Sequence, residues 1–355
     1  MTMRATITLI FFASALNLLA QFPPIDLEWS ALRPYPSMYG ANTHISRDDV
    51  HGNYVWAVQG TAVQTDEVRN VFLPDGTDVT PLFPYEFSVG SLDYLTNLCV
   101  HDSVLHTTMF HMNIGGNPQD IYWHLDGTTV QTDGDGYLND RGDGLLVTDD
   151  AVYGCGNTDT SFQPPVTVAR ALKQDLQGNV QWNVTWSDPT SSNSSFSSLA
   201  VIGDTVICAA YPNLVLLDDN TGVVIDVLEF NPPVGGQLVA RGTRIYWGFT
   251  TGTDIRFGYY DLVTGSGLND VVPLSGLGGQ AHIVMDDQDR LWIGTTVDNN
   301  QGQWFRLDSE FTQVDSGTLY ASIDDMCFVN GKISFTGILD PESAIAYVIT
   351  GTPQP

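Results

Sequence analysis

The sequence predicts an all-β protein that folds as a seven-bladed β-propeller, with the ring closed by the N-terminal strand. A hairpin phrase recurs along the chain, and its copies begin at Val50, Val100, Val147, Val201, Ala240, Met285 and Val329. The spacing of about 40–50 residues is the length of a four-stranded propeller blade. The chain has 355 residues and 13 Lys plus Arg in total, which argues against long helices with charged Lys/Glu faces.

Each copy of the phrase joins a short apolar strand to a second strand through a tight polar turn. Clear examples are VIGDTVICA at residues 201–209 and ARGTRIYWG at residues 240–248. Short turns that contain glycine between β-rich runs are typical of hairpins. We expect the aromatic residues of the second strands to pack between blades, and these are Trp56, Tyr153, Tyr246, Trp292 and Phe335.

A third and a fourth strand are expected after several of the hairpins. The clearest copy is VLLDDNTGVVI at residues 215–225, and similar phrases cover residues 172–182, 259–265 and 304–308. Each has an apolar run, a turn ending in Gly or Asp, and sometimes a second run. Alternating apolar and polar positions suit sheets that pack face to face.

The last unit lacks one strand, and the start of the chain can supply it. After Phe335, only Ile345–Ile349 predicts a further strand, whereas Ile25–Leu32 has no hairpin partner. Pairing these two segments would cover an open sheet edge, which otherwise invites aggregation. The Ser- and Asn-rich insertion at Trp186–Ser198 predicts a solvated loop and leaves a six- or eight-bladed count as an alternative.

The N-terminus predicts export. Residues 1–20 combine the positive charge of Arg4 with the apolar run Ile7–Ala15, as in a secretory signal peptide. We therefore expect residues 21–355 to form one propeller domain that is secreted or periplasmic, monomeric and without a membrane span. With 41 Asp plus Glu against 13 Lys plus Arg, the formal charge is −28, which argues against nucleic acid as a partner.

Several phrases of the sequence resemble repeats of two known propeller families. LVLLDDNTGVVIDVLEF and LKQDLQGNVQWNV resemble the outer strands of quinoprotein-like propeller repeats, and HIVMDDQDRLWIGTT resembles blades of streptogramin-lyase-like propellers. Quinone enzymes of the first family carry adjacent cysteines, and no two cysteines are adjacent here. Lyases of the second family use His and Glu on the central face, and His282 matches that position without a nearby Glu.

Two histidines and an aspartate are candidate catalytic residues. His44 and His282 begin similar phrases in blades 1 and 6, so both are expected on innermost strands that face the central channel. Asp286, and the comparably placed Asp48, Asp324 and Asp325, are expected nearby. Imidazoles and carboxylates together could hold a divalent metal or perform acid–base chemistry. The alternative is that they are polar residues at strand starts that face channel water.

A loop at residues 132–144 is a candidate calcium site. It offers oxygen ligands, the type that calcium prefers, from Asp133, Asp135, Asn139, Asp140 and Asp143. The spacing departs from an EF-hand, and the alternative is an inter-blade loop rich in turn-forming residues. No cofactor other than calcium is expected.

The cysteines and the unplaced aromatic residues leave alternatives open. Four cysteines in an exported chain allow two disulfides or four buried thiols, and they are Cys99, Cys155, Cys208 and Cys327. Aromatic residues outside the strand pattern could stack on sugars at a loop rim, and they are Trp29, Tyr35, Tyr39, Trp123 and Trp186.

The sequence favours an exported, non-catalytic recognition or scaffold propeller that binds a protein or carbohydrate partner. The alternative is a channel-centred lyase or hydrolase that uses His44 and His282 with a divalent metal. The quinoprotein-like resemblance implies a third class, a scaffold for outer-membrane assembly, which would bind a protein and no small molecule.

Overall fold

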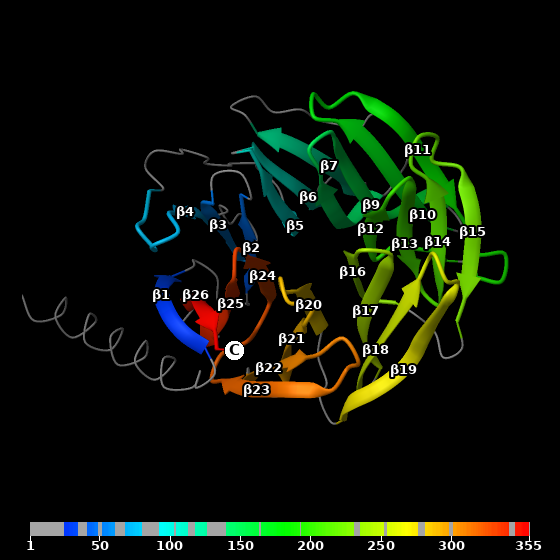
Figure 1. Ribbon diagram of the computed structural model, residues 1–355. Coiled ribbons are helices and arrows are strands. Elements are labelled where there is room, and N and C mark those ends of the chain that lie inside the picture. Colours follow the sequence, from blue (N-terminus) through cyan, green and yellow to red (C-terminus); the bar gives the residue numbers. More distant parts are fainter. Residues whose placement is uncertain are drawn as a thin grey trace, which may run out of the picture.

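The computed structural model shows a ring of β-sheets around a centre (Figure 1). The structure describes residues 25–34, 41–48, 52–60, 68–79, 92–102, 104–112, 118–125, 140–162, 165–191, 193–230, 235–251, 254–275, 281–297, 301–340 and 345–354. All the regular elements in these ranges are strands, and they form seven antiparallel sheets. The predicted seven-bladed all-β architecture is confirmed.

The blades follow one another in chain order, and successive strands of each blade lie progressively farther from the centre of the ring. Blades 1 and 2 comprise β2 (Ala41–Arg47), β3 (Tyr54–Gly60) and β4 (Val68–Phe72), then β5 (Leu92–His101), β6 (Val104–Met112) and β7 (Pro118–Leu125). Blades 3 and 4 comprise β8 (Asp140–Val147), β9 (Ala151–Phe162), β10 (Pro165–Asp175) and β11 (Val180–Trp186), then β12 (Ser198–Ile202), β13 (Thr205–Ala210), β14 (Asn213–Asp218) and β15 (Val224–Glu229). Blades 5 and 6 comprise β16 (Gln237–Arg241), β17 (Arg244–Thr251), β18 (Asp254–Asp261) and β19 (Ser266–Ser275), then β20 (Ala281–Met285), β21 (Leu291–Val297), β22 (Gln301–Leu307) and β23 (Gln313–Leu319). Blade 7 comprises β24 (Asp325–Val329), β25 (Lys332–Asp340), β26 (Ile345–Pro353) and the N-terminal β1 (Ile25–Pro34).

The N-terminal strand completes the last blade. β1 runs antiparallel to β26, with Ile25 opposite Pro353 and Pro34 opposite Ile345. Each inner strand also contacts the inner strand of the next blade, including β24 with β2. The two ends of the chain therefore share one sheet, as the missing strand of the last unit predicts.

The aspartates that recur after third strands cap the turns that follow. Asp218 accepts hydrogen bonds at Oδ1 from the backbone N–H groups of Asn220 and Thr221, at 3.2 and 2.9 Å. Asp308 accepts them in the same way from Glu310 and Thr312. A short acceptor side chain that satisfies turn N–H groups stabilises the reversal locally, so these two acidic residues have a structural use.

The core lies between the blades and is dominated by tryptophan. Trp56, Trp247, Trp292 and Trp304 are fully buried, and the other aromatic residues predicted for the core are buried as well. Gly258 lies against one of these rings, because a Cβ there would come within 2.4 Å of Trp247. Close packing of flat rings against glycine backbone gives the dense interior that a propeller needs.

A buried lysine links blade 3 to blade 4. Lys173 donates to Asp219 with an Nζ–Oδ2 distance of 2.6 Å, and its ammonium lies 5.2 Å from the centre of the Tyr153 ring. Asp219 also accepts from the Tyr153 hydroxyl at 2.8 Å, and its backbone carbonyl accepts from Trp182 Nε1 at 2.8 Å. The carboxylate thus ties the turn of one blade to two strands of its neighbour.

Two sequence-based predictions receive an answer from the fold. The insertion at 186–198 is not simply a solvated loop, because Phe196 is fully buried in the core between blades 3 and 4, and Asp188 and Ser194 are buried as well. The buried Phe196 side chain fills space between the two blades and so holds this polar segment against them. No disulfide joins any two of the four cysteines, all of which are described, so the disulfide alternative is wrong in this structure.

The segment predicted as a signal peptide, residues 1–20, lies outside the described residues. Among the residues that the structure does describe, no membrane-spanning helix is present.

Candidate functional site

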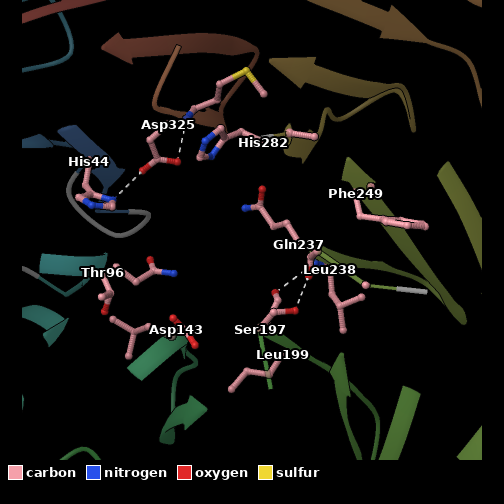
Figure 2. Close-up of a pocket in the computed structure, with 18 of the residues that line it drawn as sticks. His44, Thr96, Asp143, Ser197, Leu199, Gln237, Leu238, Phe249, His282 and Asp325 are labelled. Atoms are coloured by element: carbon pink, nitrogen blue, oxygen red, sulfur yellow. Dashed lines mark hydrogen bonds and ion pairs between the residues drawn. The ribbon is translucent and has the colours of Figure 1, made fainter. Parts of the chain in front are cut away.

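A cavity of about 580 Å³ occupies the centre of the ring. All seven inner strands contribute to its wall (Figure 2). Its lining includes His44, Ile45, Thr96, Asn97, Leu98, Asp143, Leu145, Leu146, Ser197, Ser198, Leu199, Tyr211, Gln237, Leu238, Phe249, Thr250, Ala281, His282, Asp325 and Met326, together with glycines 235, 236 and 248. The cavity is therefore the central channel on which the sequence-based hypothesis depends.

Polar side chains of the inner strands hydrogen-bond the backbone of the next blade. In each of four such bonds a backbone N–H donates to a side chain of the preceding blade over 2.7–3.1 Å. The bonds run from Ile45 to Asp325, from Val100 to Ser46, from Leu238 to Ser198, and from Ile283 to Gln237. The inner edges of neighbouring sheets would otherwise leave these backbone donors unpaired, which is costly in a buried position. Several polar residues around the channel therefore hold the ring together.

The two predicted histidines come together on one side of this cavity. Figure 2 shows His44 and His282 on either side of Asp325. His44 Nδ1 lies 3.6 Å from Asp325 Oδ2. Burial lowers the pKa of His282, although the charge of Asp325 acts in the opposite direction, so this imidazole favours its neutral form.

Asp286 does not join this group. Its carboxylate accepts hydrogen bonds from the backbone of Gln288, from Arg290 Nε at 2.7 Å and from Trp292 Nε1 at 3.0 Å. The residue is buried in the turn between β20 and β21 and is absent from the cavity lining. The sequence places it four residues after His282, and the turn of the hairpin carries it away from the channel.

Of the acids that the sequence suggests for the channel, those at the start of blade 7 lie beside the histidines. Asp325 lines the cavity, and Asp324 accepts from Thr43 Oγ1 at 3.2 Å. Burial raises the pKa of Asp324 to about 6, although its hydrogen bonds to Ser322 and Thr43 act in the opposite direction. Asp325 is thus the carboxylate that the cavity presents beside the imidazoles, whereas Asp324 is buried behind it.

The candidate calcium ligands fall mostly outside the described residues. Asp133, Asp135 and Asn139 lie there, and Asp140 is placed in β8 without a described side chain. Asp143 lines the central cavity, and Ser195 Oγ lies 3.5 Å from its Oδ2. Within the part of the chain that the structure describes, no three His, Cys, Asp or Glu side chains are arranged to hold a metal ion.

Tyr211 is an exposed aromatic residue at the cavity that the sequence analysis did not identify. Tyr211, in the turn between β13 and β14, lines the cavity and is 65% exposed. Of the predicted candidates, Trp29 is buried against Tyr54, and Trp186 stacks on Phe196 with ring centres 6.0 Å apart. The signal that favours Tyr211 is an aromatic residue in a hairpin turn, where core packing does not require one.

The remaining aromatic candidates are not among the described side chains. Tyr35 and Tyr39 lie outside the described residues, and Trp123 belongs to β7 without a described side chain.

Comparisons with known proteins show a likeness of fold. No protein-family model matches the chain, and no curated protein matches it. The solved structures that resemble it include BamB from Moraxella catarrhalis, which is 13% identical with a TM-score of 0.50, over 86% of this chain and 83% of that one. A chain in the crystal structure of a mitotic checkpoint complex is 11% identical with a TM-score of 0.60, over 92% of this chain and 91% of that one.

Proposed function

We propose that this protein is an exported, non-catalytic recognition propeller that binds its partner at the mouth of the central cavity. The observation that carries the proposal is the cavity itself, because all seven inner strands line one space of about 580 Å³. Concave sites with a few convergent polar groups are the usual places of ligand binding. Export rests on the signal-like residues 1–20.

A binding role agrees better than catalysis with the hydroxyl groups in the cavity. Ser198 Oγ accepts from the Leu238 N–H, and Ser197 Oγ donates to the Gly236 carbonyl at 3.1 Å. Among the residues that the structure describes, neither hydroxyl is hydrogen-bonded to an imidazole that could act as its base, which an activated nucleophile needs. Both serines therefore serve the packing of one blade against the next.

The resemblances are consistent with a scaffold. One of the similar solved structures is a mitotic checkpoint complex, so the neighbouring chain is part of an assembly. The repeat phrases resemble those of quinoprotein-like propellers, without the adjacent cysteines of the quinone enzymes. We accordingly propose a monomer that works by contact with its partner rather than by chemistry on a cofactor.

Site-specific photo-crosslinking tests the proposal directly. A benzophenone amino acid replaces Tyr211 in one variant and Tyr320 in the other, and each is irradiated with envelope and medium fractions of the source organism. Both side chains are similarly exposed, at 65% and 70%, but Tyr320 is absent from the cavity lining. Adducts at position 211 that are missing at position 320 are expected. Equal or absent labelling at the two positions would contradict a partner at the cavity mouth.

A second candidate function is acid–base chemistry in the channel, and the His44–Asp325 contact of 3.6 Å favours it. A carboxylate beside an imidazole orients the ring and stabilises its protonated form, and His282 supplies a neutral partner nearby. This candidate predicts turnover of a ligand that the crosslinking identifies. Turnover that survives in both His44→Ala and His282→Ala would exclude it.

A further inference from the structure

Three features of the cavity point to the chemical class of its ligand. The first is an exposed aromatic ring at the wall. A Cβ on Gly235 would come within 3.2 Å of the Tyr211 ring, so this backbone covers part of the ring while the side chain as a whole stays 65% exposed. Phe249 also lines the cavity, but it is buried in the core between blades 4 and 5, so of these two rings Tyr211 is the one open to a ligand. Flat apolar rings of this kind pack against the C–H faces of sugars.

The second feature is a pair of uncommitted polar groups beside these rings. Gln237 uses its Oε1 atom to accept from the Ile283 N–H at 2.7 Å. Its Nε2 has no hydrogen-bond partner among the described residues, and Figure 2 shows the amide extending into the cavity. The ring nitrogens of His282 likewise have no hydrogen bond within that part of the chain, and burial keeps the ring neutral by lowering its pKa. A neutral imidazole provides one donor and one acceptor.

The third feature is the charge of the lining. Asp143 and Asp325 line the cavity, and no Lys or Arg is among the described residues that form its wall. The whole chain carries a formal charge of −28. An anionic ligand would lose its hydration without gaining a positive partner, which disfavours phosphates, sulfates and acidic sugars.

We propose that the central cavity binds a neutral sugar residue of a glycan, an inference that rests on the proposed recognition function. Tyr211 stacks on the pyranose face, Gln237 Nε2 donates to one hydroxyl, and His282 exchanges a hydrogen bond with another. The carboxylates accept from further hydroxyl groups. Hydroxyl groups both donate and accept, so they match a lining that mixes amide, imidazole and carboxylate groups.

The test uses the full-length mature chain on an array of neutral oligosaccharides built from glucose, galactose, mannose and N-acetylglucosamine. Sialylated and uronic-acid glycans serve as the acidic comparison, and the best neutral binder is then titrated calorimetrically. Binding to at least one neutral glycan, with no preference for acidic ones, is expected. Absence of binding to every neutral glycan, or a preference for the acidic set, would overturn the inference.

Matched variants locate the site. Tyr211→Ala should weaken binding at least tenfold, Tyr211→Phe should retain it within about threefold, and Tyr320→Ala should leave it unchanged. Gln237→Glu keeps an acceptor for the Ile283 N–H and removes the donor, so it should weaken binding about tenfold without lowering the unfolding midpoint. Unchanged affinity in both Tyr211→Ala and Gln237→Glu would place the sugar elsewhere and refute the proposal.

The crosslinking experiment separates this inference from the function on which it rests. Adducts at position 211 that consist of polypeptide alone, together with an empty glycan array, would refute the sugar and leave the recognition function standing. Absence of any adduct at position 211 would refute both.

Discussion

Lys173→Met tests whether buried charge holds neighbouring blades together. Lys173 and Lys332 are the two lysines of the chain, and they lie in contrasting environments. The Lys173 side chain is 7% exposed and contacts Asp219, whereas Lys332 pairs with Glu28 at the surface, where the two side chains are 25% and 31% exposed. Methionine keeps most of the aliphatic stem that packs beside Tyr153 and removes the ammonium group.

The expected loss follows from what remains after the substitution. Asp219 keeps the Tyr153 hydroxyl but loses the Nζ contact of 2.6 Å. Breaking a buried ion pair by removing one partner costs about 3–5 kcal/mol, because the other charge stays buried. The Asp219 side chain is 17% exposed, so some water can replace the lysine, and we expect about 3 kcal/mol. An exposed pair is worth about 0–1 kcal/mol, so Lys332→Met should cost less than about 1 kcal/mol.

Urea unfolding monitored by tryptophan fluorescence measures both variants, since Trp182 Nε1 donates to the Asp219 carbonyl at the same contact. The free energy of unfolding should fall far more for Lys173→Met than for Lys332→Met. Adding Asp219→Asn to Lys173→Met should recover part of the loss, because it removes the charge left behind. Equal effects of the two lysine substitutions, or no recovery in the double variant, would refute the reasoning.

Three further predictions concern a carboxyl group, a glycine and two thiols. Burial raises the pKa of Asp324 from its ordinary value of 3.8 to about 6, so the folded state binds the proton more tightly and the stability from this group falls as pH rises from about 4 to about 6. Asp324→Asn should therefore gain up to about 3 kcal/mol relative to wild type between pH 4 and pH 7, and a constant difference in unfolding free energy would contradict this. Gly258→Ala places a Cβ within 2.4 Å of Trp247 and should lower stability by about 1–3 kcal/mol; an unchanged thermal midpoint would show that the ring yields. Burial raises the pKa of the Cys155 and Cys208 thiols, so maleimide should label them only in denaturant, as mass spectrometry can show, and rapid labelling of the native protein would exclude this packing.

The repeating elements were predictable because their signals are local. The turns after third strands carry an Asp that caps them, as Asp218 and Asp308 do, and the hairpins carry short polar turns. The pairing of Ile25–Leu32 with the last blade was also predictable, since one strand was missing there and one was left over. Phe196 was missed because a single aromatic residue in a Ser-rich segment gives no periodic signal for burial.

The candidate site was predicted in part. His44 and His282 were placed correctly on inner strands, because their phrases align with the repeat. Asp286 was grouped with Asp48, Asp324 and Asp325 because all four lie in comparable stretches of the repeat, whereas the hairpin turn uses the Asp286 carboxylate for Arg290 and Trp292. Asp325, another member of that group, is the acid that meets the histidines.

The sequence alone determined the class of fold and the strand that closes the ring, because hydrophobic alternation and turn chemistry act over a few residues and repeat. It favoured seven blades, and the tertiary structure decided between that count and six or eight. The composition of the central cavity was decided by the tertiary structure, because it brings together inner strands from opposite ends of the chain, such as those that carry His44 and Asp325. The packing of the blades also decides which polar side chains of the cavity already have a hydrogen-bond partner. Gln237 and Asp325 each accept a hydrogen bond from the backbone of the following blade. Contacts between distant segments leave no periodic trace in a single sequence, because each partner looks like an ordinary polar residue at the start of a strand.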